Sequence, residues 1–242
     1  MMTMMNDSKV SENLQQPIPV SFKVIGIGSE TIDIIEEVKS FDYDCVGCLV
    51  AKDLVDCVPT DEDKMVIIVA KDNVEATNEI AKTYHDAGVL TIGLVPEPDY
   101  SFYDSVAAET CPVDFSETIK NLLLPVVSYG YICFDFNDLC TILKDSHSFS
   151  TLTTNGRTVE DAVVSMKEQL ESVALKDIES LTAHIYFNRE RRDKIKMEDM
   201  VHLSNMISNL PESIDVIWSV NFDDTLPEDV IKFTIIMSGK EL

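Results

Sequence analysis

Two aspartates near the middle of the chain, Asp135 and Asp138, have the residue type and spacing that could do chemistry. They lie in the stretch Gly130-Tyr-Ile-Cys-Phe-Asp-Phe-Asn-Asp-Leu139. If a helix begins there, side chains three residues apart point the same way, as a catalytic pair of carboxylates requires. The alternative is structural, with Asp135 as the N-cap and Asp138 as the acid at position N3, where the helix dipole favours negative charge. Local chemistry favours the cap, because helix caps are far commoner than catalytic pairs.

Six cysteines are a second possible source of chemistry. Cys45 and Cys48 have CxxC spacing, but residues 45–50 have the composition of a buried strand, in which these two side chains would point to opposite faces. The sequence contains no second CxxC or Cys/His pair at a spacing that completes a zinc site. We therefore expect reduced core thiols and no metal site.

The four histidines do not indicate a catalytic triad. His85, His147, His184 and His202 have no Ser, Cys or acid partner at an informative spacing. His184 lies in a segment of alternating polarity and is expected to face solvent. A hydrolase is therefore the least supported class.

One short segment concentrates positive charge. Arg189, Arg191, Arg192, Lys194 and Lys196 form the only basic cluster in the sequence. Acidic residues flank it, which favours a solvated loop. By charge complementarity, an interface with an acidic protein is the alternative.

The chain as a whole is strongly acidic, with 242 residues, a formal charge of −24 and a pI near 4.3. This balance argues against nucleic acid and against an anionic membrane surface, both of which require a basic face. The longest apolar runs are strand-length and too short to span a bilayer. Residues 1–20 are polar, lack the apolar segment of a signal peptide and are expected to form a flexible tail. The sequence therefore predicts a cytoplasmic protein without direct membrane contact.

Residues 21–112 have the pattern of a parallel, right-handed βαβ unit. The strands are expected at 22–27, 45–50, 65–70 and 89–95, with a helix at 73–87. Gly26, Gly28 and Ser29 follow the first strand, as in a phosphate-binding loop, but the acidic residue Glu30 comes next. As a phosphate motif this loop is weak.

The rest of the chain has a different pattern of predicted helices and strands. Residues 113–130 are expected to form a central helix, capped by Asp114 or Ser116. Residues 131–242 are expected to form an α+β subdomain with a mixed sheet. Its elements are predicted as helices at 156–174 and 197–210 and strands at 181–187, 214–220 and 230–237.

Several segments resemble, in the same order, segments of the bacterial cell-division protein FtsZ and of tubulin. The stretch from Gly130 to Leu139 resembles the FtsZ synergy loop, whose motif is NxDxxD. Other segments similar to that family are 22–28, 80–95, 181–187, 217–223 and 232–239. The resemblance spans about residues 21–239. It implies the tubulin-like fold, a reduced Rossmann-like α/β subdomain followed by a central helix and an α+β subdomain.

The resemblance also implies a role for the two aspartates. In that family the loop of one subunit enters the nucleotide pocket of the next, and its acids position and polarise the attacking water. Asp135 and Asp138 match those acids, whereas Cys133 replaces the asparagine of the motif. The predicted interface therefore includes Cys133, Asp135 and Asp138, and we add Arg189, Arg191 and Arg192 on grounds of charge.

The phosphate-binding signature of the family is missing. After the buried segment 65–70 comes Lys-Asp-Asn-Val-Glu, and no glycine follows until Gly88. A phosphate nest needs consecutive N–H groups in conformations that glycine allows, and Asp72 and Glu75 would repel a triphosphate. The sequence therefore predicts that no cofactor is bound, with GTP as the alternative, and it leaves Gly26, Gly28 and Ser29 as the remnant of a nucleotide site.

The acids that are present and the glycines that are missing together predict an FtsZ-like protein that has lost GTP binding. Such a protein would dock on FtsZ, on an FtsZ-like protein or on itself, and would act in cell division. One alternative is a divergent GTPase that polymerises by itself. A second is a scaffold unconnected with filaments, in which Asp135 and Asp138 are helix caps and nothing more.

Overall fold

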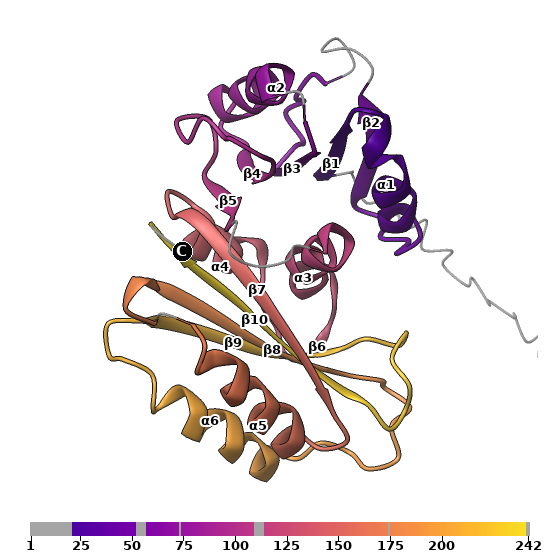
Figure 1. Ribbon diagram of the computed structural model, residues 1–242. Helices are drawn as coiled ribbons and strands as arrows, with labels where there is room; N and C mark the ends of the chain where they lie inside the picture. Colours follow the sequence, from indigo (N-terminus) through magenta and orange to yellow (C-terminus); the bar gives the residue numbers. More distant parts are fainter. Residues whose placement is uncertain (1–20, 52–56, 73, 109–113, 174, 241–242) are drawn as a thin grey trace, which may run out of the picture.

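The computed structural model describes residues 21–51, 57–72, 74–108, 114–173 and 175–240, so the tail predicted for residues 1–20 lies outside the described residues. The strands are β1 (Phe22–Ile27), β2 (Val46–Ala51), β3 (Met65–Ala70), β4 (Leu90–Leu94), β5 (Ser105–Ala107), β6 (Gly130–Ile132), β7 (His147–Gly156), β8 (Ser180–Phe187), β9 (Asp215–Phe222) and β10 (Ile231–Gly239). Within the described residues they form one ten-stranded sheet in the order β2-β1-β3-β4-β5-β7-β10-β8-β9-β6 (Figure 1).

The helices cover this sheet in layers. The α-helices are α1 (Ile32–Lys39), α2 (Val74–Asp86), α3 (Phe115–Val127), α4 (Phe136–Leu143), α5 (Val159–Leu170) and α6 (Val201–Ile207). Short 3₁₀ turns are η1 (Ser29–Thr31), η3 (Leu175–Asp177) and η4 (Met197–Met200). No helix in the described part of the chain is both long and apolar enough to cross a membrane.

The first four strands form the parallel sheet that the sequence predicts, and a fifth, β5, which was not predicted, extends it. Strands β1 and β3 have the predicted bounds, whereas β2 lies one residue later than predicted and is a half-buried edge strand rather than a buried one. Strand β3 is buried on both faces because its side chains alternate between two apolar clusters. One cluster contains Ile67 and helix α3, and the other contains Ile68 and helix α2.

Strand β5 and helix α3 join the two halves of the molecule. Strand β5 pairs in parallel with both β4 and β7, so the sheet continues from one half into the other. Helix α3 lies between the two halves (Figure 1), and its N-cap is Asp114, whose carboxylate accepts the Glu117 N–H. The predicted central helix is thus confirmed with slightly narrower bounds, and it continues past Pro125 to Val127.

The C-terminal half is the mixed α/β layer that the sequence predicts. Strand β10 is antiparallel to β7 and β8, β8 is parallel to β9, and β6 is antiparallel to β9. Helices α5 and α6 cover one face, and α3 and α4 lie on the other (Figure 1). Helix α5 begins with a capping box, since the Thr158 hydroxyl accepts the Asp161 N–H and the Asp161 carboxylate accepts the Thr158 N–H.

Three features of this half differ from the sequence prediction. The long strand β7 was not predicted, and Gly156 belongs to it rather than to helix α5, which begins at Val159. The helix predicted at 197–210 is divided into η4 and α6. The short edge strand β6 was not predicted either.

Candidate functional site

The loop at residues 133–138 ends in a fully formed capping box. Asp135 is the N-cap of α4, and its Oδ1 accepts the N–H groups of Asn137 at 2.7 Å and Asp138 at 3.0 Å. In return Asp138 Oδ2 accepts the Asp135 N–H at 3.0 Å. The predicted helix cap is therefore confirmed. Within the described residues the second oxygen of each carboxylate has no hydrogen bond, so it can still contact a partner.

Buried aromatic rings hold the 133–138 loop in place. The ring of Phe134 is buried and meets the His184 imidazole edge-on, with centroids 4.7 Å apart. The ring of Phe136 packs at 5.5 Å from that of Phe22 in β1. Cys133, between β6 and Phe134, is exposed and is therefore not the core thiol that the sequence predicts. The 133–138 loop is thus a rigid segment that presents Cys133 and the two aspartates to solvent.

Two tyrosines extend the surface beside Cys133, and the sequence analysis did not identify them. Tyr129 and Tyr131 are 78% and 60% exposed, and the Tyr131 ring packs edge-on against that of Phe222 at 5.3 Å. The guanidinium of Arg189 lies 5.1 Å from the centre of the Phe222 ring and forms an ion pair with Asp224. The sequence signal was available, because Tyr129 directly precedes β6 and Tyr131 lies in it, and residues two apart in an extended segment point to the same side.

His184 is a structural residue and not the solvent-facing side chain that the sequence predicts. It is 0% exposed, because Phe134 packs on the face of β8 that the sequence pattern assigned to solvent. Both ring nitrogens are hydrogen-bonded, Nδ1 to the Ser219 hydroxyl at 2.8 Å and Nε2 to the Thr182 hydroxyl at 2.9 Å. Burial lowers the pKa of His184 to about 3, so the imidazole is neutral at physiological pH.

The glycine loop after β1 is filled by an acidic side chain. Gly28 has a φ of 89°, which only glycine adopts readily, and Ser29 begins the η1 turn. The Glu30 carboxylate folds back over this glycine, so that a Cβ at Gly28 would collide with it. Gly26 is packed equally tightly, against Thr31. Where a phosphate-binding loop presents free N–H groups, this loop presents a carboxylate.

A second acid completes this arrangement. Asp72, which follows β3, lies beside Glu30. A hydrogen bond to the Glu30 side chain, which Asp72 can donate only when it is protonated, and the negative charge of Glu30 raise the pKa of Asp72. Glu30 Oε1 is buried and has no hydrogen-bond partner among the described residues. The two loops meet because β1 and β3 are neighbouring parallel strands. The sequence identified both acids, but their pairing follows from strand order.

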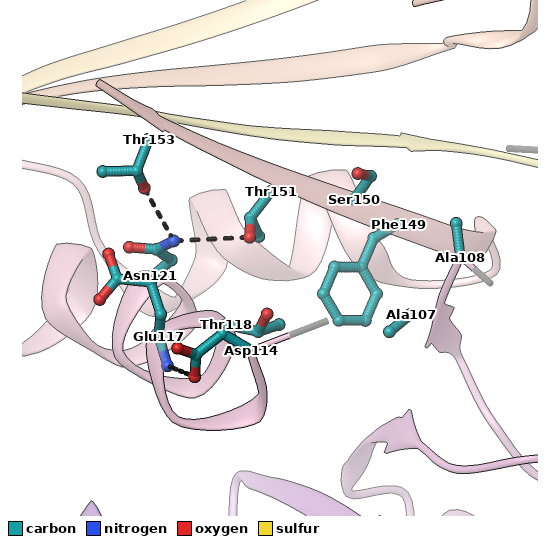
Figure 2. A pocket seen from close by; sticks show the side chains of 10 residues that line it. All are labelled: Ala107, Ala108, Asp114, Glu117, Thr118, Asn121, Phe149, Ser150, Thr151 and Thr153. Atoms are coloured by element: carbon teal, nitrogen blue, oxygen red, sulfur yellow. Dashed lines mark hydrogen bonds between the residues drawn. The ribbon is translucent and has the colours of Figure 1, made fainter. Parts of the chain in front are cut away.

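A small polar cavity lies nearby, between the start of α3 and strand β7 (Figure 2). Its volume is about 130 Å³, well below the roughly 300–1,000 Å³ of usual ligand pockets. Asn121 is buried on its wall and donates to the hydroxyls of Thr151 at 3.4 Å and Thr153 at 3.1 Å. Glu117 is bound to Lys232 at 2.7 Å. The cavity is therefore a feature of the packing between the halves, with room for a few water molecules.

The basic cluster is only partly the solvated loop or interface that the sequence predicts. Arg191 is 7% exposed, and its guanidinium donates to the carbonyl oxygens of Asp193, Glu228 and Arg157. It therefore holds three loops together and is not free to contact a partner. Arg189 and Arg192 are exposed.

The described residues contain no group of three or more His, Cys, Asp and Glu side chains placed to hold a metal ion. Cys45 and Cys48 are half-buried, and burial is the main cause that raises the pKa of both thiols. Cys111 lies outside the described residues.

Solved structures of filament proteins are similar to this chain over most of its length. An FtsZ W319Y mutant from M. jannaschii is 13% identical and has a TM-score of 0.72, with 91% of each chain covered. An empty FtsZ dimer from M. jannaschii is 13% identical with a TM-score of 0.67, covering 93% of this chain and 89% of that one. The TubZ of Bacillus thuringiensis serovar israelensis, in GDP-form protofilaments, is 9% identical with a TM-score of 0.60, covering 92% and 86%. The chain has an FtsZ/tubulin-like fold. No protein-family model matches the sequence.

The loop with Gly28 and the 133–138 loop lie in different parts of this FtsZ-like fold. The loop with Gly28 follows the carboxyl end of β1, where open parallel sheets bind their ligands. The 133–138 loop instead follows the edge strand β6, in the other half of the sheet. The two candidate regions that the sequence identified are therefore separate in one molecule. Only contact between two molecules could bring one against the other.

Proposed function

We propose that this chain is an FtsZ-like protein that does not bind GTP and that docks on a filament-forming partner. The partner is FtsZ, an FtsZ-like protein or a second copy of the chain. The docking face consists of the 133–138 loop, with Asp135 and Asp138, and the neighbouring side chains Tyr129, Tyr131 and Arg189. We place this activity in the cytoplasm, in cell division.

One contrast supports this proposal. The glycine loop is closed by the Glu30 carboxylate, with Asp72 beside it, whereas the 133–138 loop is anchored by two aromatic rings and presents Cys133 and Asp135 to solvent. Two acids beside the loop oppose a triphosphate by charge. Tyr131 and Arg189, which both pack on Phe222, are of the residue types enriched at protein interfaces.

The first test is nucleotide binding. We expect no saturable heat when GTP or GDP is titrated, with magnesium, into the full chain in a calorimeter. An authentic FtsZ under the same conditions serves as the positive control. Micromolar binding of either nucleotide would refute the loss of GTP binding.

The second test is docking. We expect the chain to co-sediment with filaments of the FtsZ-like protein of its source organism, and the double variant Asp135→Asn/Asp138→Asn to bind about tenfold more weakly, which corresponds to ~1.4 kcal/mol. Asparagine keeps the cap but removes the charge. The matched control is Asp161→Asn, which removes one charge from the capping box of α5, away from the proposed face. Equal binding by all variants would contradict the proposed face.

The alternative is a divergent GTPase that polymerises by itself. It is favoured by two of the similar structures, an FtsZ dimer and TubZ protofilaments in the GDP form. Light scattering that requires GTP and disappears in Asp138→Ala would establish it. If neither docking nor polymerisation occurs, the remaining function is a scaffold, in which the two aspartates only cap α4.

A further inference from the structure

A second, larger cleft lies at the amino-terminal ends of β3 and β4, below the C-terminal end of α2 and beside α4. Its volume is about 620 Å³, within the usual range for small-molecule sites. The strands β1, β3 and β4 are parallel, so their amino-terminal ends lie together. The cleft is therefore at the opposite end of these strands from the Gly28 loop, which follows the carboxyl end of β1. Val89, Leu90 and Phe136 supply apolar wall, and the sequence analysis did not identify the cleft.

Two buried carboxylates form part of its wall. Asp104 is 5% exposed, and its Oδ2 accepts the Thr91 N–H at 2.8 Å. Asp63 is 6% exposed, and its Oδ2 accepts from the Lys23 ammonium and the Thr60 N–H, both at 2.7 Å. Asp63 Oδ1 is buried and, among the described residues, has no hydrogen-bond partner. The wall of the cleft therefore holds two buried carboxylates, and one oxygen of Asp63 lies beneath its surface without a partner among the described residues.

The two carboxylates differ in how their charge is compensated. Asp63 is neutralised by Lys23, but Asp104 forms no ion pair within the described part of the chain. A buried charge without a partner is costly, and it is tolerated where another group supplies the missing charge. The remaining charged groups lining the cleft are Asp61, Asp145, Lys64, Lys144 and the half-buried His85. Apart from His85, four carboxylates and three ammonium groups surround the cleft, Lys23 included, so the acids outnumber the lysines by one.

We propose that this cleft binds an organic cation, a primary ammonium or guanidinium group, with Asp104 as the counter-ion. Charge-assisted hydrogen bonds of N–H donors to carboxylates are the strongest that such a site can make. The apolar wall suits an aliphatic chain attached to the cation. A free alkyl diamine or a Lys or Arg side chain of a second copy would supply the same chemistry. The proposal concerns the isolated chain and does not depend on docking to a filament.

The test uses 1,4-diaminobutane as the probe, titrated into the full chain by calorimetry at neutral pH. We expect saturable binding that weakens by about tenfold or more in Asp104→Asn, because asparagine keeps the acceptor for Thr91 but removes the charge. Glu79→Gln, which removes one exposed charge from α2 outside the cleft, is the matched control and should bind like the wild type. Acetate and magnesium chloride are the control titrants. Saturable magnesium binding that is lost in Asp104→Asn would overturn the proposal in favour of a metal site.

A second variant keeps every carboxylate. Ala87 is exposed and lines the cleft just after α2. Ala87→Lys places a tethered ammonium there and should abolish diamine binding, whereas Ala87→Gln should retain it within about threefold, since both side chains are long and only one is charged. Equal loss in both variants would mean that bulk rather than charge decides, and would overturn the proposal.

Sedimentation velocity distinguishes the two sources of the cation. Binding of diamine by a chain that sediments as a monomer assigns the site to a free ligand. If the chain self-associates, if diamine converts the oligomer to monomer, and if Asp104→Asn stays monomeric, the site is assigned to a side chain of a second copy. If the chain neither binds diamine nor self-associates through Asp104, the cleft is not a cation site.

Discussion

At the scale of single residues, His184 illustrates how a polar group in the core affects the pH dependence of stability. The neutral imidazole makes two hydrogen bonds, one to Ser219 and one to Thr182. Among the described residues no carboxylate is bonded to this ring. Because burial lowers its pKa to about 3, well below the ordinary value of 6.5, the unfolded chain takes up a proton before the folded protein does. Acid therefore favours the unfolded state through this residue.

We predict that the change from pH 7 to pH 5 costs the folded protein about 2 kcal/mol through His184, since the unfolded chain gains a proton below pH 6.5 and the folded protein does not. The measurement is the free energy of unfolding by urea at both pH values, in the wild type and in His184→Gln. Glutamine can still bond to Ser219 and Thr182 but does not titrate. The same pH dependence in both proteins would show that the imidazole is not buried as described.

At the scale of elements, the capping boxes determine where helices α4 and α5 begin. Such caps are local in sequence, so the sequence analysis could predict the one at Asp135 from residue type and spacing. Strand β7 could not be predicted in this way. Its serine- and threonine-rich residues become a strand by pairing with β5 on one side and β10 on the other, and both partners are distant in sequence.

The cap of α4 gives a prediction that separates structure from docking. We expect Asp135→Ala to lower the free energy of unfolding by about 1 kcal/mol, because two N–H groups lose their acceptor, and Asp135→Asn to change it by only a few tenths. Urea unfolding of both variants is the measurement. If Asn destabilises as much as Ala, then the charge, and not the acceptor, stabilises the helix.

At the scale of the whole molecule, the sequence was informative about fold and less so about sites. The order of weak FtsZ-like segments predicted the fold that the solved structures share. The contact between Glu30 and Asp72 depends on the adjacency of β1 and β3, and the cleft with Asp63 and Asp104 is built from segments far apart in the chain. Side-chain periodicity reports which face of an element is buried, but not which elements meet there.

One apolar cluster extends across both halves, uniting Ile67 of β3, Leu122 of α3, Phe149 of β7 and Ile236 of β10. A gene fragment encoding either half alone would leave part of this cluster facing water, and an exposed apolar face of that kind promotes aggregation. We therefore expect evolution to change the length and sequence of the loops of such a chain, but not to delete one half while the other half is kept. The two halves are therefore expected to be inherited together, so that ligand sites in the loops can be lost or gained while the shared scaffold is kept.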